Sequence, residues 1–482
     1  METKTNIVVE HKTKIVATLG PASDNREVLR EMMLSGLDVC RLNFSHGLHE
    51  VYAQTIQLIR DLSAELNHPI AILADLQGPK LRVGEVENNG VELINGNLIT
   101  FTTEKMVGTA ERVYMTYTNF PKDVKVGEKI LMDDGKLQCE VVSTNRENEV
   151  VAKITHGGIL GSKKGVNLPN TNVSLPCLTE KDLADLEFVL QQEVDWIGLS
   201  FVRRADDIRE LRAILKERKS LARIVAKIEK PEALREIDEI IEETDAIMVA
   251  RGDLGVEIPM QQVPLMQKML IKKARKSAKP VIVATQMMES MITNITPTRA
   301  EVNDVANAVM DGADAVMLSG ETSVGKFPVE VIRTMGEIIT EVEKKVSDIY
   351  HKETRPVDVY DERFITNSIC HQAVKLAARV DAKAIVTMTH SGYTAFKLSS
   401  FRPKSAVYAF SSNRRLLSSL SLVWGVRCFY YDKYVGTDQT ISDIKHILQK
   451  SQLLEKGDYL INIASMPITE RGMANMMKLS EI

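Results

Sequence analysis

The stretch "ARIVAKIEKPEALREIDEIIEETDAIMVARG", residues 222–252, decides the fold. It begins with the apolar, β-branched run "ARIVAKIE" and ends with a second such run, "DAIMVARG", and each run predicts a buried strand. Between them, "PEALREIDEIIEET" has the apolar spacing of a helix. Continuous apolar strands separated by a helix favour parallel pairing through a right-handed crossover. The stretch therefore predicts a β-α-β unit of a parallel sheet.

The same strand-helix unit recurs along the chain. Eight units over about 250 residues match the size of a (β/α)8 barrel, so the predicted fold class is α/β with a TIM barrel. In such a barrel the active site lies at the carboxyl ends of the strands. The predicted strands span residues 13–20, 38–45, 69–76, 195–201, 222–229, 245–252, 280–287 and 314–320.

Two further regions differ from the barrel repeat. From about residue 83 to residue 176, apolar and polar residues alternate around Asn-Gly and Asp-Gly turns, which predicts an inserted antiparallel β domain. Beyond about residue 351, strands and helices alternate again and predict a separate α/β domain. We therefore expect a barrel from residues 1–83 and 177–350, an inserted domain at 84–176 and a C-terminal domain at 351–482.

The composition is that of an ordinary globular protein, and 482 residues suffice for about two to four domains. A net charge of −4 provides no basic field, so we expect neither nucleic acid nor a membrane as a partner. The opening "METKTNIVVEHKTK" lacks the apolar core of a secretory signal, and no apolar run is long enough to span a membrane. Five scattered cysteines predict reduced thiols and a cytoplasmic protein.

Every predicted strand after the first ends in polar side chains. One such residue alone is more often a satisfied loop residue, but polar groups on all the later strands at one barrel mouth predict an active site. These residues are Arg41, Asn43, Ser45, His46, Asp75, Ser200, Lys227, Glu229, Arg251, Asp253, Thr285, Ser319 and Glu321.

Lys227 and Glu229 stand two residues apart on one strand, so their side chains face the same side. Alone, they would be interpreted as a plain ion pair. Asp253, at the end of the next strand, changes this interpretation, because two carboxylates from neighbouring strands form an oxygen-rich site suited to Mg²⁺. Arg41 and Arg82 add local cations, so the substrate is predicted to be phosphorylated, carboxylated or both.

Long motifs lie in order along the chain: "TKIVATLGPAS", "RLNFSHG", "GPKLRVG", "AKIEKPEA", "MVARGDLGVEIP", "ATQMMESMI", "PTRAEVNDVANAV" and "DGADAVMLSGETSVGKFPVEVI". In these motifs and their order, the chain resembles the pyruvate kinase family over essentially its whole length. Such a series is far more specific than any single short motif. The family has a (β/α)8 barrel, an inserted antiparallel β-barrel domain that acts as a lid, and a C-terminal α/β regulatory domain.

The resemblance implies the last step of glycolysis, the transfer of phosphate from phosphoenolpyruvate to ADP, which yields pyruvate and ATP. It implies that Glu229 and Asp253 hold an essential Mg²⁺ or Mn²⁺ ion. Lys227 would stabilise the phosphoryl transition state and the enolate, while Arg41 and Arg82 would contact the transferring phosphate. This chemistry depends on alignment and charge neutralisation rather than on covalent help from the protein.

The resemblance also distributes the other site residues among three roles. The residues implied to bind the substrate are Arg41, Lys227, Gly252, Asp253 and Thr285. The residues implied to act in catalysis, including proton delivery to the enolate, are Lys227, Arg41, Arg82, Thr285, Ser319 and Glu321. The residues implied to lie near the nucleotide are Arg41, His46, Arg82 and Lys181.

Many family members also bind K⁺ beside the transferring phosphate. The matching ligands are Asn43, Ser45, Asp75 and the carbonyl group of Leu76. Members that require K⁺ typically have Glu at the position of Lys80, and this chain resembles the K⁺-independent branch at Leu76, Gln77, Lys80 and Val83. A lysine ammonium can supply the charge that K⁺ would bring, so we expect activity without K⁺. A surface lysine in a turn is the alternative interpretation.

The segment "TMTHSGYTA", residues 387–395, resembles the loop that holds sugar-phosphate effectors in this family. Thr389, Ser391, Gly392 and Thr394 are in place, and such loops can hydrogen-bond phosphate oxygens. Tyr393 stands where many members have Arg, and Glu470 near the loop would repel a second phosphate. We therefore expect a monophosphate effector or none, with a plain connecting loop as the alternative. The resemblance also implies a homotetramer.

Two other functions remain open on the sequence. One is a Mg²⁺-dependent (β/α)8 aldolase or lyase that acts on the enolate of pyruvate, which would not need Arg82 or the inserted domain. The other is a non-catalytic metabolite sensor, which would not need Lys227, Glu229, Asp253 and Thr285 together. Formation of ATP from phosphoenolpyruvate and ADP separates these functions from that of a pyruvate kinase.

Overall fold

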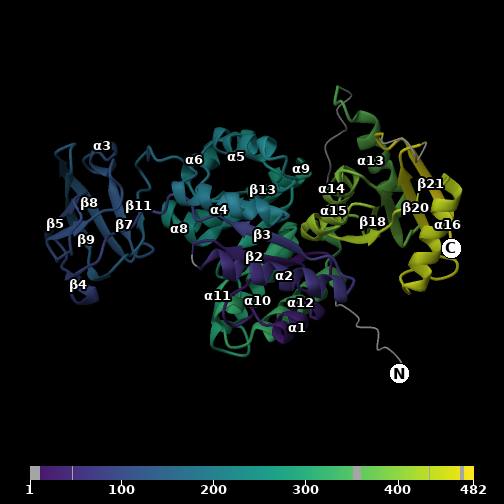
Figure 1. Ribbon diagram of the computed structural model, residues 1–482, viewed down its shortest axis with the longest axis horizontal. Helices are drawn as coiled ribbons and strands as arrows, with labels where there is room; N and C mark the ends of the chain where they lie inside the picture. The colour runs from purple at the N-terminus through teal and green to yellow at the C-terminus, as the bar shows by residue number, and fades with distance from the viewer. Residues whose placement is uncertain (1–10, 46, 351–359, 434, 467–471) are drawn as a thin grey trace.

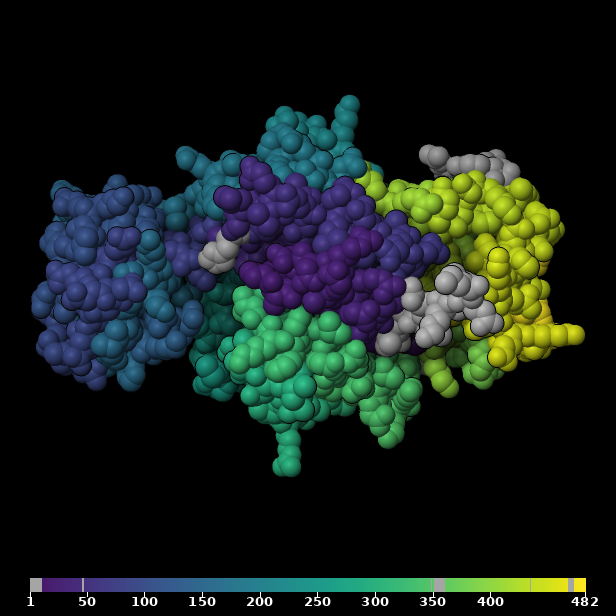
Figure 2. All heavy atoms as spheres, turned by 60° about the horizontal axis from the view of Figure 1, so that its bottom comes forward, coloured from purple at the N-terminus to yellow at the C-terminus, as the bar shows by residue number. Residues whose placement is uncertain are grey.

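The computed structural model describes residues 11–45, 47–350, 360–433, 435–466 and 472–482. Three bodies follow one another along its longest axis, with the barrel between the insert and the C-terminal domain (Figure 1). Figure 2 shows the same order on the molecular surface, with the insert in blue and the C-terminal domain in yellow. The exact domain boundaries expected from the sequence remain predictions.

Eight parallel strands close into a barrel in the order β1-β16-β15-β14-β13-β12-β3-β2, which confirms the predicted (β/α)8 fold. Most residues of these strands are apolar and buried, as expected for strands covered by helices. The strands are β1 (Lys14–Thr18), β2 (Val39–Asn43), β3 (Ala71–Asp75), β12 (Trp196–Leu199), β13 (Arg223–Ile228), β14 (Ala246–Ala250), β15 (Val281–Ala284) and β16 (Ala315–Leu318).

The helices surround this barrel and bury their apolar faces against it. Their N-termini carry local signals, such as the capping boxes of Thr179 with Asp182 and of Thr298 with Glu301. The helices of this layer are α1 (Arg26–Leu34), α2 (His49–Glu65), α4 (Glu180–Gln191), α5 (Ala205–Glu217), α6 (Pro231–Arg235), α7 (Ile237–Glu243), α8 (Arg251–Glu257), α9 (Val263–Lys276), α10 (Arg299–Asp311), α11 (Gly320–Ser323) and α12 (Pro328–Lys345).

The amino end of the barrel is filled with apolar side chains and covered by the C-terminal domain. Trp196 and Met248 belong to this filling, and Leu422 of the C-terminal domain packs into the same cluster. The Trp196 indole Nε1 donates a hydrogen bond to the carbonyl oxygen of Ser419 at 3.0 Å. The polar strand ends therefore lie at the opposite, carboxyl end, where the insert is attached.

The insert consists of a six-stranded sheet, in the order β11-β7-β8-β9-β5-β6, and a two-stranded ladder of β10 and β4. The pairs are antiparallel, as predicted, except for the parallel pair β5–β6. The elements are β4 (Gly90–Leu93), β5 (Leu98–Thr102), β6 (Arg112–Tyr114), α3 (Phe120–Asp123), β7 (Lys129–Met132), β8 (Leu137–Thr144), β9 (Glu149–His156), β10 (Gly158–Gly161) and β11 (Val166–Asn167).

The C-terminal domain is an α/β sheet in the order β19-β18-β17-β20-β21, in which β21 is antiparallel to β20. This arrangement confirms the predicted α/β domain. Its elements are α13 (Phe364–Arg379), β17 (Ala384–Met388), α14 (Tyr393–Ser400), β18 (Ala406–Ser411), α15 (Arg414–Ser419), β19 (Val426–Tyr430), α16 (Thr437–Lys450), β20 (Tyr459–Ala464) and β21 (Met476–Glu481).

A buried ion pair joins the C-terminal domain to the barrel. Arg402, which is 1% exposed, donates from Nη2 to Asp314 Oδ2 at 2.9 Å and to the carbonyl oxygen of Gly312 at 2.7 Å. Its guanidinium also lies over the Trp424 ring, 4.8 Å from the centroid. Asp314 directly precedes β16, so this contact is made at the amino end of a barrel strand.

All five cysteines are free, and four of them are buried, in agreement with the predicted reduced thiols. Within the described ranges, none of the helices has the length and apolar character that crossing a bilayer requires.

Candidate active site

Arg41, Asp75, Lys227 and Glu229 form one network at the carboxyl end of the barrel. Arg41 Nη2 lies 2.6 Å from Asp75 Oδ2, and Arg41 Nε donates a hydrogen bond to the same oxygen at 2.7 Å. Lys227 Nζ lies 3.2 Å from Asp75 Oδ1 and 3.0 Å from Glu229 Oε1. Both carboxylates are almost fully buried, so water screens their attraction to the two cations poorly.

Strand β12 allows this close approach because it presents glycine to Asp75. A Cβ atom added at Gly198 would lie 2.9 Å from Asp75 Oδ1, where a real side chain would clash. Ser200, just after this strand, accepts a hydrogen bond from Lys227 Nζ at 2.7 Å and donates to the carbonyl oxygen of Leu76 at 2.7 Å. Ser200 thereby fixes the ammonium group relative to β3.

The protonation states follow from this network. Burial alone would raise the pKa of Asp75, but the Lys227 and Arg41 cations hold it below its usual value. Burial would lower the pKa of Lys227, but the Asp75 and Glu229 carboxylates raise it well above that of a free lysine. Burial and the Asp253 carboxylate raise the pKa of Glu229, and Lys227 opposes them. Lys227 is thus a permanent cation.

Glu229 and Asp253 fit a divalent cation as ligands. Glu229 directly follows β13, and Asp253 lies in the first turn of α8, which follows the adjacent strand β14. Asp253 raises the pKa of Glu229 because the two negative charges are close. A divalent cation between them would remove this repulsion. The described residues contain no group of three or more acidic, His or Cys side chains placed for a metal ion. Two carboxylates suit Mg²⁺, because it retains water molecules and binds substrate oxygens.

Thr285 and Gly252 meet beside these carboxylates. The Gly252 backbone N–H donates to Thr285 Oγ1 at 2.7 Å. Thr285 has a φ of +70°, a conformation that residues other than glycine rarely adopt. Arg251 stabilises this backbone by donating from Nη2 to the carbonyl oxygen of Thr285 at 2.7 Å, and Arg251 itself pairs with Asp304. The structure thus brings together Gly252 and Thr285, two of the predicted substrate-binding residues.

Glu321 and Ser319 lie at the end of β16, the last barrel strand. The buried Glu321 carboxylate accepts the backbone N–H groups of Ser319 at 2.7 Å and of Met288 at 3.2 Å. Both of its oxygens are therefore engaged by the loops after β15 and β16. In this arrangement Glu321 holds the loop of Thr285 close to Ser319.

The chain leaves the barrel for the insert at Gly78, whose φ is +68°. Lys80 Nζ lies 3.9 Å from Asp253 Oδ1, so the structure places this lysine next to a candidate metal ligand. Arg82 Nη1 donates to the carbonyl oxygen of Lys163 in the insert at 3.0 Å. Of the three charged residues in this segment, Asp75 and Lys80 thus contact the barrel mouth, and Arg82 contacts the insert.

Two models of known protein families match this chain, one over the barrel with its insert and one over the C-terminal domain. Residues 10–332 match the model of the pyruvate kinase barrel domain, and residues 367–480 match that of the pyruvate kinase alpha/beta domain. The chain belongs to the pyruvate kinase family. It is therefore a phosphotransferase enzyme, and the barrel mouth described above is the candidate active site of a pyruvate kinase.

Individual pyruvate kinases match over nearly the whole chain. That of Geobacillus stearothermophilus is 43% identical over 478 residues, which cover 98% of this chain and 81% of the relative. That of Corynebacterium efficiens is 42% identical over 471 residues, which cover 97% of this chain and 97% of the relative. The crystal structure of a pyruvate kinase from Cryptosporidium parvum superimposes on this chain with a TM-score of 0.92 and 34% sequence identity. The match covers 99% of this chain and 97% of the Cryptosporidium chain.

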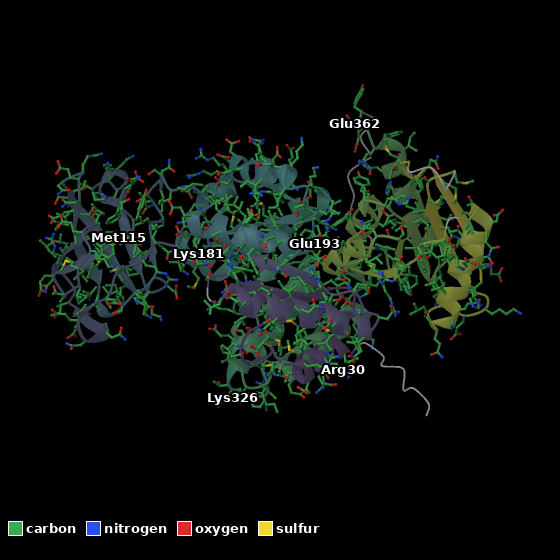
Figure 3. The ribbon with its side chains drawn as sticks, in the orientation of Figure 1. Arg30, Met115, Lys181, Glu193, Lys326 and Glu362 are labelled. Atoms are coloured by element: carbon green, nitrogen blue, oxygen red, sulfur yellow. The ribbon has the colours of Figure 1, made fainter. Side chains whose placement is uncertain are left out.

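The predicted nucleotide residue Lys181 lies on α4 at the insert-facing end of the barrel, opposite the end marked by Glu193 (Figure 3). Its Nζ atom donates to the carbonyl oxygen of Phe44 at 2.6 Å and to Asp185 Oδ2 at 2.5 Å. This places Lys181 against the segment that follows β2. The predicted nucleotide residue His46 lies outside the described residues.

The predicted monovalent-cation ligands Asn43, Ser45, Asp75 and Leu76 already have protein partners. Asn43 Oδ1 accepts the backbone N–H of Ser45 at 3.2 Å. Asp75 has Arg41 at one oxygen and Lys227 at the other, and the carbonyl group of Leu76 accepts from a serine hydroxyl. The carboxylate of this candidate site is thus neutralised by the protein itself.

The predicted effector loop follows β17 in the C-terminal domain and lines a cavity of about 100 Å³. The Gly392 backbone N–H donates to Thr389 Oγ1 at 2.9 Å, and the hydroxyl groups of Thr387 and Thr394 lie 2.6 Å apart. Tyr393, which stands where many family members have Arg, donates through its hydroxyl to Asn367. Ser391 and Lys433 also line the cavity, whereas Glu470 lies outside the described residues.

The sequence did not reveal the residues that hold the hinge of the insert. The Gly78 backbone N–H donates to Asp182 Oδ1 at 3.0 Å, which ties the outgoing chain to the start of α4. Arg203 donates to the carbonyl oxygens of Val173 and Leu175 in the returning chain. The capping pattern of Asp182 was visible in the sequence, but Arg203 carried no local signal.

Proposed function

We propose that this pyruvate kinase requires one divalent cation, Mg²⁺ or Mn²⁺, held by Glu229 and Asp253, and does not require K⁺. The observation that carries the proposal is the buried Lys227 ammonium, which lies within 3.2 Å of both Asp75 and Glu229 at the barrel mouth. In the reaction, the bond from phosphorus to the enol oxygen of phosphoenolpyruvate breaks and a bond to a terminal oxygen of ADP forms. The enolate then takes a proton at carbon to give pyruvate.

Charge neutralisation is the main task of the protein in this reaction. When bound, the divalent cation neutralises charge on the transferring phosphoryl group. Lys227 neutralises the charge that develops on the enol oxygen. Arg41, which pairs with the other oxygen of Asp75, orients the phosphate. Arg82 reaches the phosphate only after it leaves its contact with the carbonyl group of Lys163.

The carboxylate of the substrate binds near the backbone of Gly252 and Asp253 and near the hydroxyl group of Thr285. This assignment is supported by the unusual backbone of Thr285, which Arg251 stabilises. Proton delivery to the enolate proceeds through Thr285, Ser319 and Glu321. Nucleotide binding is assigned to Arg41, His46, Arg82 and Lys181.

Two features of the local charge support independence from K⁺: the neutralised carboxylate of Asp75 and the ammonium group of Lys80. Asp75, the only acidic member of the candidate K⁺ ligands, is already neutralised by Arg41 and Lys227. Lys80 adds a positive charge 3.9 Å from Asp253. We further propose a sugar monophosphate as an allosteric effector at Thr389, Ser391, Gly392 and Thr394, and a cytoplasmic homotetramer that acts in glycolysis.

The test is formation of ATP from phosphoenolpyruvate and ADP in a buffer balanced with tetramethylammonium. Activity should require Mg²⁺ or Mn²⁺ and should be lost in Glu229→Gln and Asp253→Asn. Addition of K⁺ should change the rate less than about twofold, whereas a rise of about tenfold would contradict independence from K⁺. Absence of ATP formation would favour a lyase or a sensor instead.

A further inference from the structure

Glu257, the last residue of α8, joins the insert to the barrel. Its Oε1 atom accepts a hydrogen bond from Asn167 Nδ2 at 2.7 Å and another from Lys230 Nζ at 2.5 Å. Asn167 ends β11, the last strand of the insert, and Lys230 belongs to the loop after β13. One carboxylate oxygen therefore connects three separate parts of the chain.

This carboxylate and its partner Lys230 each lie close in sequence to one of the proposed metal ligands. Lys230 directly follows Glu229, and Glu257 follows Asp253 by four residues, about one helical turn of α8. The Glu257 side chain is therefore linked through Lys230 to the segment of Glu229, and through α8 to Asp253. It is also linked to Asn167 in the insert.

Stability alone does not account for this arrangement. The Glu257 side chain is 1% exposed and that of Lys230 is 12% exposed, so their attraction is offset by the loss of hydration of both charges. In addition, Glu257 Oε2 is buried and has no hydrogen-bond partner among the described residues. An unsatisfied buried acceptor destabilises the fold. A contribution to stability is therefore a weak explanation for this carboxylate.

We propose that Glu257 is a positioning residue that couples the position of the insert to the geometry of Glu229 and Asp253. It holds Glu229 through Lys230, holds Asp253 through α8, and holds the insert through Asn167. The inference rests on the proposed metal site. A residue that orients metal ligands in this way typically changes metal affinity by about 10–100-fold when it is substituted.

The experiment compares two variants by Mn²⁺ affinity, measured by electron paramagnetic resonance without substrates, and by steady-state kinetics. Glu257→Gln removes the charge that holds Lys230 and should weaken Mn²⁺ binding at least about tenfold. Asn167→Ala removes only the contact with the insert. It should weaken Mn²⁺ binding less than Glu257→Gln does and lower kcat/KM about tenfold, because it loses a hydrogen bond to a charged group.

Matched controls lie elsewhere in the chain. Asn148 Nδ2 donates to Glu104 Oε1 at 2.8 Å wholly within the insert, so Asn148→Ala should leave kinetics and Mn²⁺ affinity unchanged. Asp38 pairs with Lys14 at 3.1 Å at the amino end of the barrel, so Asp38→Asn should cost stability without weakening Mn²⁺ binding. If Glu257→Gln fails to fold, Asn167→Asp places a second carboxylate against Glu257 and should lower kcat/KM further than Asn167→Ala.

The outcomes separate this inference from the metal site itself. If Glu229→Gln loses Mn²⁺ while Glu257→Gln binds it normally, the metal site stands and the coupling is refuted. If Glu229→Gln also binds Mn²⁺ normally, the metal site fails, and the inference fails with it. Equal kinetics for Asn167→Ala and Asn148→Ala would refute the role of the insert contact.

Discussion

Replacement of Lys227 by methionine should abolish most turnover while the fold persists. Lys227 is the cation shared by Asp75 and Glu229, with separations of 3.2 and 3.0 Å. A unit charge at about 4 Å contributes about 4 kcal/mol at an effective dielectric constant of about 20. If that energy acts on charge that develops in the transition state, its loss lowers kcat by about 10³-fold. The assay is ATP formation at saturating phosphoenolpyruvate, ADP and Mg²⁺.

Lys14 provides a matched control for this variant. Its ammonium pairs with Asp38 at 3.1 Å and its side chain is 10% exposed, against 12% for Lys227, but it lies at the amino end of the barrel. Lys14→Met should therefore lower the melting temperature and leave kcat unchanged. Turnover of Lys227→Met close to that of the wild type, or an equal loss in Lys14→Met, would refute the reasoning.

The Lys227 variant should also change how stability depends on pH. Burial and Asp253 raise the pKa of Glu229 and Lys227 opposes them, so removal of Lys227 raises the folded-state pKa further above the unfolded value. A carboxyl group with a raised folded-state pKa binds more protons when folded, so its stabilisation is lost as pH rises from about 4.3 toward that pKa. The difference in melting temperature between this variant and the wild type should widen as pH rises above about 4.3, the ordinary pKa of a glutamate. The double variant with Glu229→Gln should not show this widening.

Three further changes test the hinge, the domain contact and the role of Lys80. Gly78→Ala should cost about 1–3 kcal/mol in urea unfolding, because φ is +68° and the new Cβ would lie 2.8 Å from Phe201. Arg402→Ala leaves Asp314 buried without its cation and should cost about 3–5 kcal/mol, whereas an unchanged unfolding midpoint would contradict the contact. Lys80→Glu should lower the rate in tetramethylammonium buffer about tenfold and make it respond to K⁺, and equal rates with both cations would argue against this role.

The barrel could be predicted from local patterns. Apolar runs such as residues 245–252 specify strands that are buried on both faces, and the intervening helical patterns allow only a few ways to connect them. Because parallel strands end on the same side, Lys227, Glu229 and Asp253 had to approach one another once the barrel closed. Their residue types then predicted the kind of ligand.

The contacts of the hinge segment could not be predicted in the same way. The sequence favoured Lys80 as a substitute for K⁺ beside Asn43 and Asp75, and the structure places its ammonium 3.9 Å from Asp253. Arg82, expected near the phosphate, donates to a carbonyl group of the insert. Both side chains are long, and their partners depend on where the insert lies relative to the barrel.

The sequence by itself determined the order of strands and helices, the end of the barrel that bears the site, and the chemical character of that site. Only the tertiary structure decided that Asp75 shares Arg41 and Lys227, and that Glu257 joins the insert to α8. The physical reason is the range of the interactions. Hydrophobic periodicity acts over a few neighbouring residues and can be read along the chain, whereas the partner of a buried charge is chosen by packing between segments that are distant in sequence.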